Sequence, residues 1–226
     1  MVAQPLKNWR TDPRAIKALA AEHAKLIAAH VWDEEVFEWS DVSRIAREAD
    51  KIIHLGRVFP IMSLKGSELS EDKQVVKARL VFSGDNVSTN VWQQLAEFAD
   101  LGSAPASMSA YRTAVALGSR PGWNVQQADA EAAYIQSVLT GAETYVIIPP
   151  ELQTPKEKLM RNPVHRPRKA LYGHPDAGTC WEVHCNKALF TAGLSQSMPG
   201  PHASCTRNRL IFNCLCGRLL VVRRGF

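Results

Sequence analysis

The chain contains no apolar run near the roughly 18 residues that a membrane-spanning helix needs. Its start, MVAQPLKNWRTDP, lacks the apolar stretch of a secretory signal. We therefore expect no membrane association and an intracellular location, in the cytoplasm or the nucleus. The five cysteines are an odd and scattered set, which argues against a disulfide framework. Internal repeats and low-complexity segments are also missing, so a solenoid or a disordered linker is not expected.

The composition is that of a globular protein able to bury a core. Of its 226 residues, 46% are hydrophobic and 22% are charged. Lys plus Arg number 27 against 22 Asp plus Glu, a formal charge of +5. This mild excess permits a polyanionic partner without requiring one. Part of it is concentrated in the second half, in HRPRK at 165–169, RNR at 207–209 and RR at 223–224.

Hydrophobic periodicity predicts an irregular alternation of helices and strands with hairpins, which is typical of an α+β fold and not of a doubly wound parallel sheet. Asp12 and Pro13 predict the cap and first residue of a helix. The other expected helices are 109–117, 130–139 and 175–192. The expected strands are 56–65, 75–82, 123–129, 144–148, 210–214 and 218–222. Residues 154–169 are expected to form a basic, proline-rich loop.

One aspartate stands in an unusual setting. In GWNVQQADAEAAYIQ, residues 122–136, the predicted strand ends at Asp129, and Tyr134 follows five residues later. A carboxylate at a strand end beside small residues can reach a metal ion, and the carbonyl of Ala130 could add an oxygen ligand. Asp129 could instead be an N-cap, and Tyr134 a core aromatic.

Two further blocks carry basic and glycine residues. In VVKARLVFSG, residues 75–84, Lys77 and Arg79 alternate on one strand face, where they could hold a triphosphate. They could equally be solvated charges that protect an edge strand. In ALYGHPDAGTCW, residues 170–181, Gly173 would let the backbone approach a template or an incoming base closely.

Together these three blocks resemble the reverse transcriptase domain of copia-type retrotransposons, over about residues 14–222. The match to its first catalytic motif is Asp129, Ala133 and Tyr134, and the KARLV and LYG blocks are also present. Relatives usually have Leu-Lys-Gln after the glycine, where this chain has His174, Pro175 and Asp176. Any role that needs that lysine or glutamine is therefore in doubt.

The resemblance implies a reverse transcriptase-like right-hand polymerase fold with template-directed nucleotidyl transfer by two magnesium ions. It makes Asp129 catalytic and, with Ala130, a metal ligand. The residues that it implies for nucleotide binding are Lys77, Arg79, Ala130, Ala133, Tyr134 as a steric gate, and Gly173. The implied partners are an RNA or DNA template-primer and a nucleoside triphosphate.

By the same resemblance, residues 1–12 form a tail, 13–85 and 138–175 form the fingers, and 86–137 and 176–226 form a partial palm. In the family, a strand like RLLVV leads into a Tyr-Val-Asp-Asp turn that completes the metal site. Here Arg223 and Arg224 follow Val222, the thumb is absent, and we expect no polymerase activity from the chain alone.

Three alternatives remain open. The chain could be a non-catalytic nucleic-acid-binding remnant or an interaction protein that uses its basic face. It could hold zinc on the set Cys180, His184, Cys185, His202 and Cys205, although the spacings match no common zinc finger. His23 and His30, seven apart, could also bind a metal, but a helix face at a packing seam explains them more simply.

Overall fold

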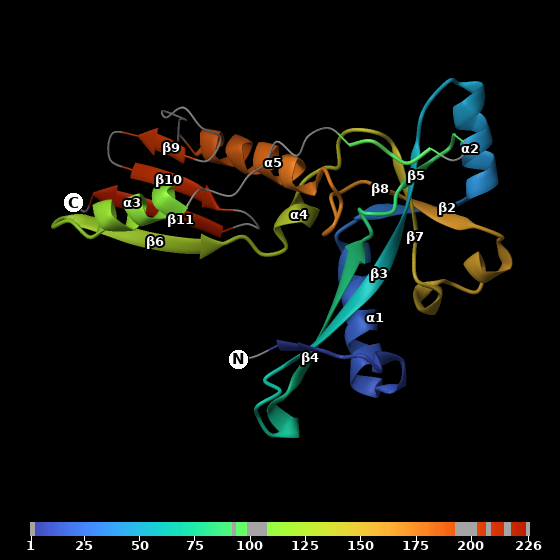
Figure 1. Ribbon diagram of the computed structural model, residues 1–226, viewed down its shortest axis with the longest axis horizontal. Coiled ribbons are helices and arrows are strands. Elements are labelled where there is room, and N and C mark those ends of the chain that lie inside the picture. Colours follow the sequence, from blue (N-terminus) through green and yellow to red (C-terminus); the bar gives the residue numbers. More distant parts are fainter. Residues whose placement is uncertain are drawn as a thin grey trace. The chain divides into compact units, whose positions relative to one another are not determined.

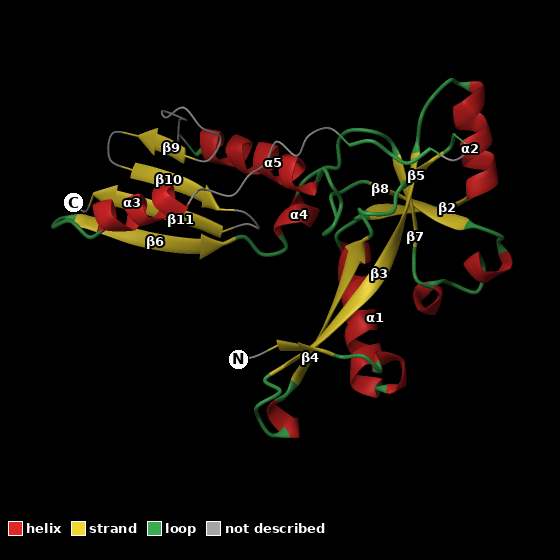
Figure 2. Cartoon of the chain, viewed as in Figure 1, coloured by secondary structure: helices red, strands yellow, loops and turns green. Residues whose placement is uncertain are grey.

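A computed structural model describes residues 3–91, 94–98 and 108–192, together with the backbone of residues 203–206, 209–214 and 218–224. The chain divides into two compact units that interleave along the sequence. Unit 1 comprises Met1–Glu97 and Leu139–His174, and unit 2 comprises Phe98–Val138 and Pro175–Phe226. Both units combine helices and strands (Figures 1 and 2), so the expected α+β class agrees with the structure at this level. Their identification as fingers and palm stays a prediction.

Unit 1 is built on a mixed sheet in which β1, β3, β7, β8 and β2 follow one another and both β4 and β5 also pair with β3. The strands are β1 (Ala3–Pro5), β2 (Trp32–Glu38), β3 (His54–Lys65), β4 (Val75–Phe82), β5 (Ser88–Thr89), β7 (Thr144–Ile147) and β8 (Pro163–Pro167). Only the pairing of β3 with β7 is parallel. The long β3 holds the unit together because it pairs with strands from four other parts of the chain.

Two helices and four 3-10 turns complete the described part of unit 1. Helix α1 (Pro13–Ala28) begins as the sequence predicts, since Asp12 accepts a hydrogen bond from the backbone N–H of Arg14 and Pro13 takes the first helical position. It packs on β4. Helix α2 (Trp39–Glu48) follows β2 directly. The 3-10 turns are Trp9–Thr11, Glu71–Lys73, Pro150–Leu152 and Glu157–Leu159.

Buried side chains between α2 and the sheet form one core cluster of unit 1. Ala46, Ile53, Tyr145 and Val164 are buried there, and Trp39 is among the half-buried residues that pack against them. Ala46 belongs to α2, Ile53 directly precedes β3, Tyr145 belongs to β7 and Val164 belongs to β8. The cluster therefore joins distant parts of the sequence. It fixes α2 against the sheet and, through Trp39, shapes the surface beside β5.

Unit 2 contains an antiparallel sheet in the order β6, β11, β10, β9. The strands are β6 (Trp123–Asp129), β9 (Ala203–Thr206), β10 (Arg209–Cys214) and β11 (Arg218–Arg224), and the helices are α3 (Met108–Gly118), α4 (Ala133–Gln136) and α5 (Ala177–Thr191). Helix α3 contacts β6, β10 and β11, and α4 contacts α5. Ala133, Trp181 and Cys185 form its buried cluster.

Several sequence expectations differ from the structure. The helix expected at 130–139 is only the four-residue α4. Residues 1–12, expected to be a tail, include β1, which pairs with the end of β3 through Ala3 and Lys65. The expected loop 154–169 contains β8, which pairs with β2. Both short strands are specified by distant partners and not by local propensity, and the prolines at the two ends of β8 hide it from a local reading.

The turn before β8 is ordered by a capping box. The Thr154 hydroxyl accepts a hydrogen bond from the Glu157 N–H at 3.3 Å, and the Glu157 carboxylate accepts one from the Thr154 N–H at 2.8 Å. Glu157 is buried, and its other carboxylate oxygen lies 3.5 Å from His165 Nε2.

No helix in the described part of the chain is long and apolar enough to cross a membrane.

Candidate functional site

One face of the β3–β4 hairpin gathers basic and apolar side chains. The antiparallel register pairs Ile61 with Arg79 and Ser63 with Lys77. Cross-strand partners point to the same side of a sheet, and alternate residues share a face. The exposed residues of this side are Arg57, Phe59, Ile61, Lys65, Val75, Lys77 and Arg79, which we call the cationic face. The hairpin is described throughout, and no position on this side is Asp or Glu.

The opposite side of the hairpin is buried. Val58 and Met62 of β3 and Ala78, Leu80 and Phe82 of β4 are at most 5% exposed. Alternation of buried and exposed residues along both strands therefore fixes which side faces solvent. The expected placement of Lys77 and Arg79 on one strand face agrees with the observed alternation.

The cations of this face form no ion pair with a described carboxylate, although the charge of Glu22 partly offsets the repulsion at Lys77. Within the described residues, no carboxylate lies within ion-pair distance of Arg57, Lys65, Lys77 or Arg79. Partial burial and the neighbouring Arg79 and Lys65 cations lower the pKa of Lys77 below its usual value. A group of unpaired, mutually repelling cations is a site where an anion gains energy by binding.

Phe59 adds an exposed aromatic ring to this face. It is 41% exposed, and Ile61 is 45% exposed on the same strand side. The Arg79 guanidinium lies over the ring of Tyr172, with Cζ 5.5 Å from the ring centroid. Sequence reasoning identified Lys77 and Arg79 but not Arg57, Phe59, Ile61, Lys65 and Tyr172. The period of two along GRVFPIMSLK could have found the β3 members.

Gly173 lies close to β4 for a structural reason. The Tyr172 carbonyl accepts a hydrogen bond from the Phe82 N–H at 2.7 Å. Gly173 has a φ of +85°, and a Cβ there would overlap the Phe82 carbonyl oxygen. The close approach that the glycine permits is therefore to the chain's own β4. The loop that carries Gly173 also carries Tyr172, over whose ring the Arg79 guanidinium lies.

Asp129 is the last residue of β6, and it is exposed. In the register with β11, its partner is Arg218, whereas Arg223 and Arg224 pair with Asn124 and Trp123. The positions after Val222 thus lie five or six residues along β6 from Asp129, about 17 Å or more at the usual rise per residue. The resemblance leads us to expect an acidic turn after Val222 and beside Asp129. The observed antiparallel register instead places the residues after Val222 near the other end of β6.

Ala130, Ala133 and Tyr134 contribute to packing in unit 2. Ala133 is buried in the cluster with Trp181 and Cys185, and Ala130 and Tyr134 pack against that cluster. The Tyr134 carbonyl accepts hydrogen bonds from the backbone N–H and the hydroxyl of Ser137. The packing of Tyr134 against the cluster is compatible with its interpretation as a core aromatic, and its role as a steric gate stays a prediction. These contacts also hold the short α4 against α5.

Within the described residues, no group of three or more His, Cys, Asp or Glu side chains is arranged to hold a metal ion. Of the zinc set, Cys180 and Cys185 are buried and take part in no disulfide. His202 and the side chain of Cys205 lie outside the described residues. His30 lies beyond the end of α1 with a φ of 51°, so it does not share a helix face with His23, whose ring lies 5.8 Å from that of Trp32.

The predicted site residues fall in different units. Lys77, Arg79 and Gly173 lie in unit 1, and the structure connects the last two through Tyr172. Asp129, Ala130, Ala133 and Tyr134 lie in unit 2. The chain matches no protein-family model, and no curated protein matches its sequence.

Proposed function

We propose that this chain derives from a copia-type reverse transcriptase and binds nucleic acid on the cationic face of its β3–β4 hairpin. The observation that carries the proposal is the face itself: exposed Arg and Lys that form no ion pair with a described carboxylate, beside exposed Phe59. The GWNVQQADAEAAYIQ, KARLVFSG and LYG blocks support the ancestry. The interleaved units also support it, because such a fingers and palm arrangement requires the chain to cross between them repeatedly.

The chemistry of the face suits a polyanionic strand. Neutralising phosphates with Lys and Arg releases condensed counterions, which favours binding at low salt. Lys77 and Arg79 are two residues apart on β4, so the Cα atoms advance by about 6.8 Å and their side chains can contact successive anionic groups. Phe59 offers a stacking surface for an unpaired base. A nucleoside triphosphate is the smaller polyanion that the resemblance assigns to Lys77 and Arg79.

We propose further that binding occurs without nucleotidyl transfer. A two-magnesium reaction needs several oxygen ligands around both ions. Asp129 has an arginine as its register partner, a residue with the same sign of charge as Mg²⁺. Among the described residues, no group of three or more His, Cys, Asp or Glu side chains is arranged to hold a metal ion. The arginine opposite Asp129 therefore supports the non-catalytic alternative.

The test is a salt titration of binding. Fluorescence anisotropy with a labelled primer-template and a labelled single strand should give a Kd that rises with salt. In the Lys77→Ala/Arg79→Ala double variant, the slope of log Kd against log salt should decrease by about two. The matched control is Lys156→Ala/Lys158→Ala, which removes two exposed charges elsewhere in unit 1 and should change binding little. Equal losses in both double variants would reject the cationic face as the site.

Primer extension tests the absence of catalysis. With Mg²⁺ and all four nucleotides, the chain should extend no primer above the protein-free control, and Asp129→Asn should change nothing. Incorporation that Asp129→Asn abolishes would overturn the non-catalytic part of the proposal while leaving the binding part intact. Competition by a nucleoside triphosphate in the anisotropy assay shows whether the face also binds the smaller anion.

A further inference from the structure

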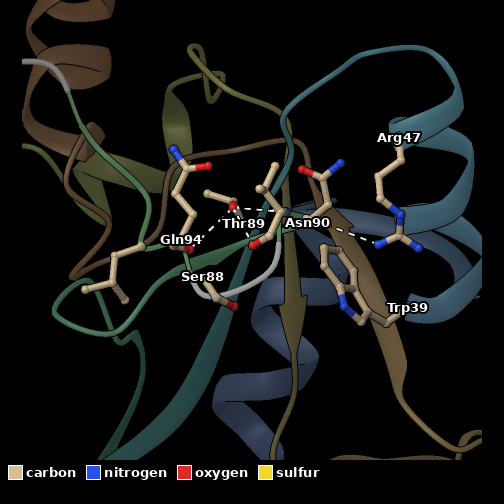
Figure 3. Close-up of a pocket in the computed structure, with 8 residues that line it drawn as sticks. Trp39, Arg47, Ser88, Thr89, Asn90 and Gln94 are labelled. Carbon is tan, nitrogen blue, oxygen red and sulfur yellow. Dashed lines mark hydrogen bonds between the residues drawn. The ribbon is translucent and has the colours of Figure 1, made fainter.

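A cavity of about 560 Å³ lies between α2 and the segment around β5, away from the exposed side of the β3–β4 hairpin. This volume is in the range of small-molecule sites. The described residues that line it are Trp39, Arg47, Thr89, Asn90, Gln94 and Leu95, together with Ser88 and Val91. Figure 3 shows the Arg47 guanidinium and the Trp39 indole on the same side of the cavity, both from α2.

The floor of the cavity is held rigidly by internal hydrogen bonds. The Asn90 side chain accepts from the Ile53 N–H at 2.9 Å and donates to the Lys51 carbonyl at 2.8 Å. The Thr89 hydroxyl lies within hydrogen-bond distance of the carbonyls of Val91 and Gln94. These polar groups are satisfied by the protein, so they shape the cavity and are not its ligand contacts.

Three groups remain for a ligand. The Arg47 guanidinium donates one hydrogen bond, to the Asn90 carbonyl at 3.2 Å, and has no carboxylate partner among the described residues. A guanidinium carries five N–H donors, so most of them can serve an anion. Trp39 is supported from behind by Tyr145, with ring centroids 6.3 Å apart. Gln94 is exposed, and its amide both donates and accepts.

We propose that this cavity binds a nucleoside monophosphate unit, with its base stacked on Trp39 and its phosphate at Arg47. The three components match: an indole face for a flat base, an amide for a base edge, and a guanidinium for a phosphate. Val91 and Leu95 supply apolar contact around the base. The choice of a nucleotide over another planar anion rests on the proposed function. The unit could be free or one residue of a single strand.

The experiment compares two probes, AMP alone and a single-stranded hexanucleotide, by isothermal titration calorimetry on the full chain. Arg47→Gln should weaken the binding of whichever probe occupies the cavity by about tenfold. The matched control is Arg44→Gln, one turn earlier on α2, which is exposed and pairs with Glu48 at 2.9 Å. It removes the same charge, and we expect less than a twofold change. Thermal unfolding confirms that both variants fold.

The two probes separate the two sources of the nucleotide. AMP binding that is sensitive to Arg47→Gln identifies a free nucleotide, and hexanucleotide binding alone identifies a strand residue. Trp39→Phe should reduce the change in tryptophan fluorescence on binding, since the indole face is lost. The proposal is overturned if neither probe binds, or if Arg44→Gln and Arg47→Gln weaken binding equally.

Rejection of the cationic face and rejection of the cavity give different results in these binding experiments. If the Lys77→Ala/Arg79→Ala variant binds nucleic acid as the wild type does, the cationic face is rejected, and AMP binding at the cavity can still be measured. If that variant loses strand binding while Arg47→Gln has no effect on either probe, the cavity is rejected and the cationic face stands.

Discussion

At the scale of single residues, the buried imidazole of His174 makes the stability of the chain depend on pH. His174 follows Gly173, is 5% exposed, and lies with its ring centroid 4.7 Å from that of Phe82. Burial, with a smaller contribution from His54, lowers its pKa from 6.5 to about 4. The folded chain therefore keeps this imidazole neutral at pH values where the unfolded chain protonates it.

The sign of the effect on stability follows directly. Between pH 6.5 and about 4 the unfolded state binds a proton that the folded state excludes, so the free energy of unfolding falls as the pH falls. This loss amounts to at most about 3 kcal/mol. We predict that His174→Leu, which replaces the imidazole with an apolar side chain, removes this share of the pH dependence. Urea unfolding at pH 7, 5.5 and 4.5 measures it.

The control for this prediction is His30→Asn, at an exposed position whose positive φ asparagine tolerates. Its unfolding should depend on pH as in the wild type. Burial also lowers the pKa values of His165 and His23, so some pH dependence should remain in His174→Leu. If the curves of wild type and His174→Leu stay parallel from pH 7 to 4.5, His174 does not titrate as described.

At the scale of elements, the sequence predicts strands that carry their own alternation and misses those that depend on a partner. Strands β3, β4 and β6 show the period of two or a β-branched run, and the expected ranges overlap the observed ones. Strands β1 and β8 have three and five residues, with prolines, and only their pairing with β3 and β2 defines them. The partial burial of Tyr134 has the same origin, because it packs against a cluster that contains Trp181, 47 positions later in the sequence.

The residues of the candidate site likewise fall into those that one strand predicts and those that depend on a distant partner. Lys77 and Arg79 could be placed on one face from β4 alone. Phe59 required the register of β3 against β4, and Tyr172 required the loop that docks on the end of β4. The cavity beside Trp39 and Arg47 brings α2 against a segment some 50 residues later. No local pattern indicates such a contact, since it depends on which elements pack together.

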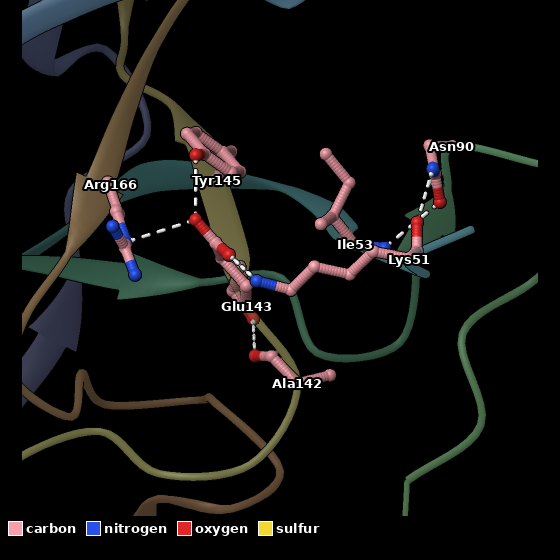
Figure 4. Close-up of polar contacts among 8 residues, drawn as sticks. Lys51, Ile53, Asn90, Ala142, Glu143, Tyr145 and Arg166 are labelled. Atoms are coloured by element: carbon pink, nitrogen blue, oxygen red, sulfur yellow. Dashed lines mark hydrogen bonds and ion pairs between the residues drawn. The ribbon is translucent and has the colours of Figure 1, made fainter. Parts of the chain in front are cut away.

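A polar network joins the start of β7 to two neighbouring elements. The Glu143 carboxylate pairs with Lys51, accepts a hydrogen bond from the Tyr145 hydroxyl at 2.8 Å, and lies 3.2 Å from Arg166 Nε (Figure 4). The Glu143 side chain is 15% exposed. Although burial opposes ionisation, the hydrogen bonds from Lys51 and Tyr145 and the Arg166 charge lower its pKa. The Glu143 carboxylate thus links β7, β8 and the segment that precedes β3.

We predict that Glu143→Gln lowers the free energy of unfolding by about 1–2 kcal/mol, because the amide keeps the shape but loses the charge that its partners require. The partly exposed Lys51 and Arg166 side chains limit the cost. Urea unfolding at pH 7 measures it, with Glu34→Gln at an exposed position of β2 as the control. Equal stability of the two variants would show that the network contributes nothing beyond its shape.

At the scale of the whole molecule, two glycines with the same backbone conformation provide a matched probe of the interleaved units. Gly173 in unit 1 and Gly122 in unit 2 have φ values of +85° and +78°. A Cβ at Gly173 overlaps β4, whereas a Cβ at Gly122 meets no heavy atom within 4 Å. Alanine should therefore cost about 1–2 kcal/mol of backbone strain at either position, with an additional clash only at Gly173.

Each unit has its own sheet and its own buried cluster, which is the condition for local opening to stay within a unit. We predict that Gly173→Ala speeds hydrogen exchange at the Phe82 amide and along β3 and β4, while the amides of the β6–β11 pairing keep their wild-type rates. Gly122→Ala should do the reverse, with a smaller effect, because it adds strain without a clash. Faster exchange in both units from either substitution would mean that the chain opens as one cooperative body, and that its interleaved units are not independent folding units.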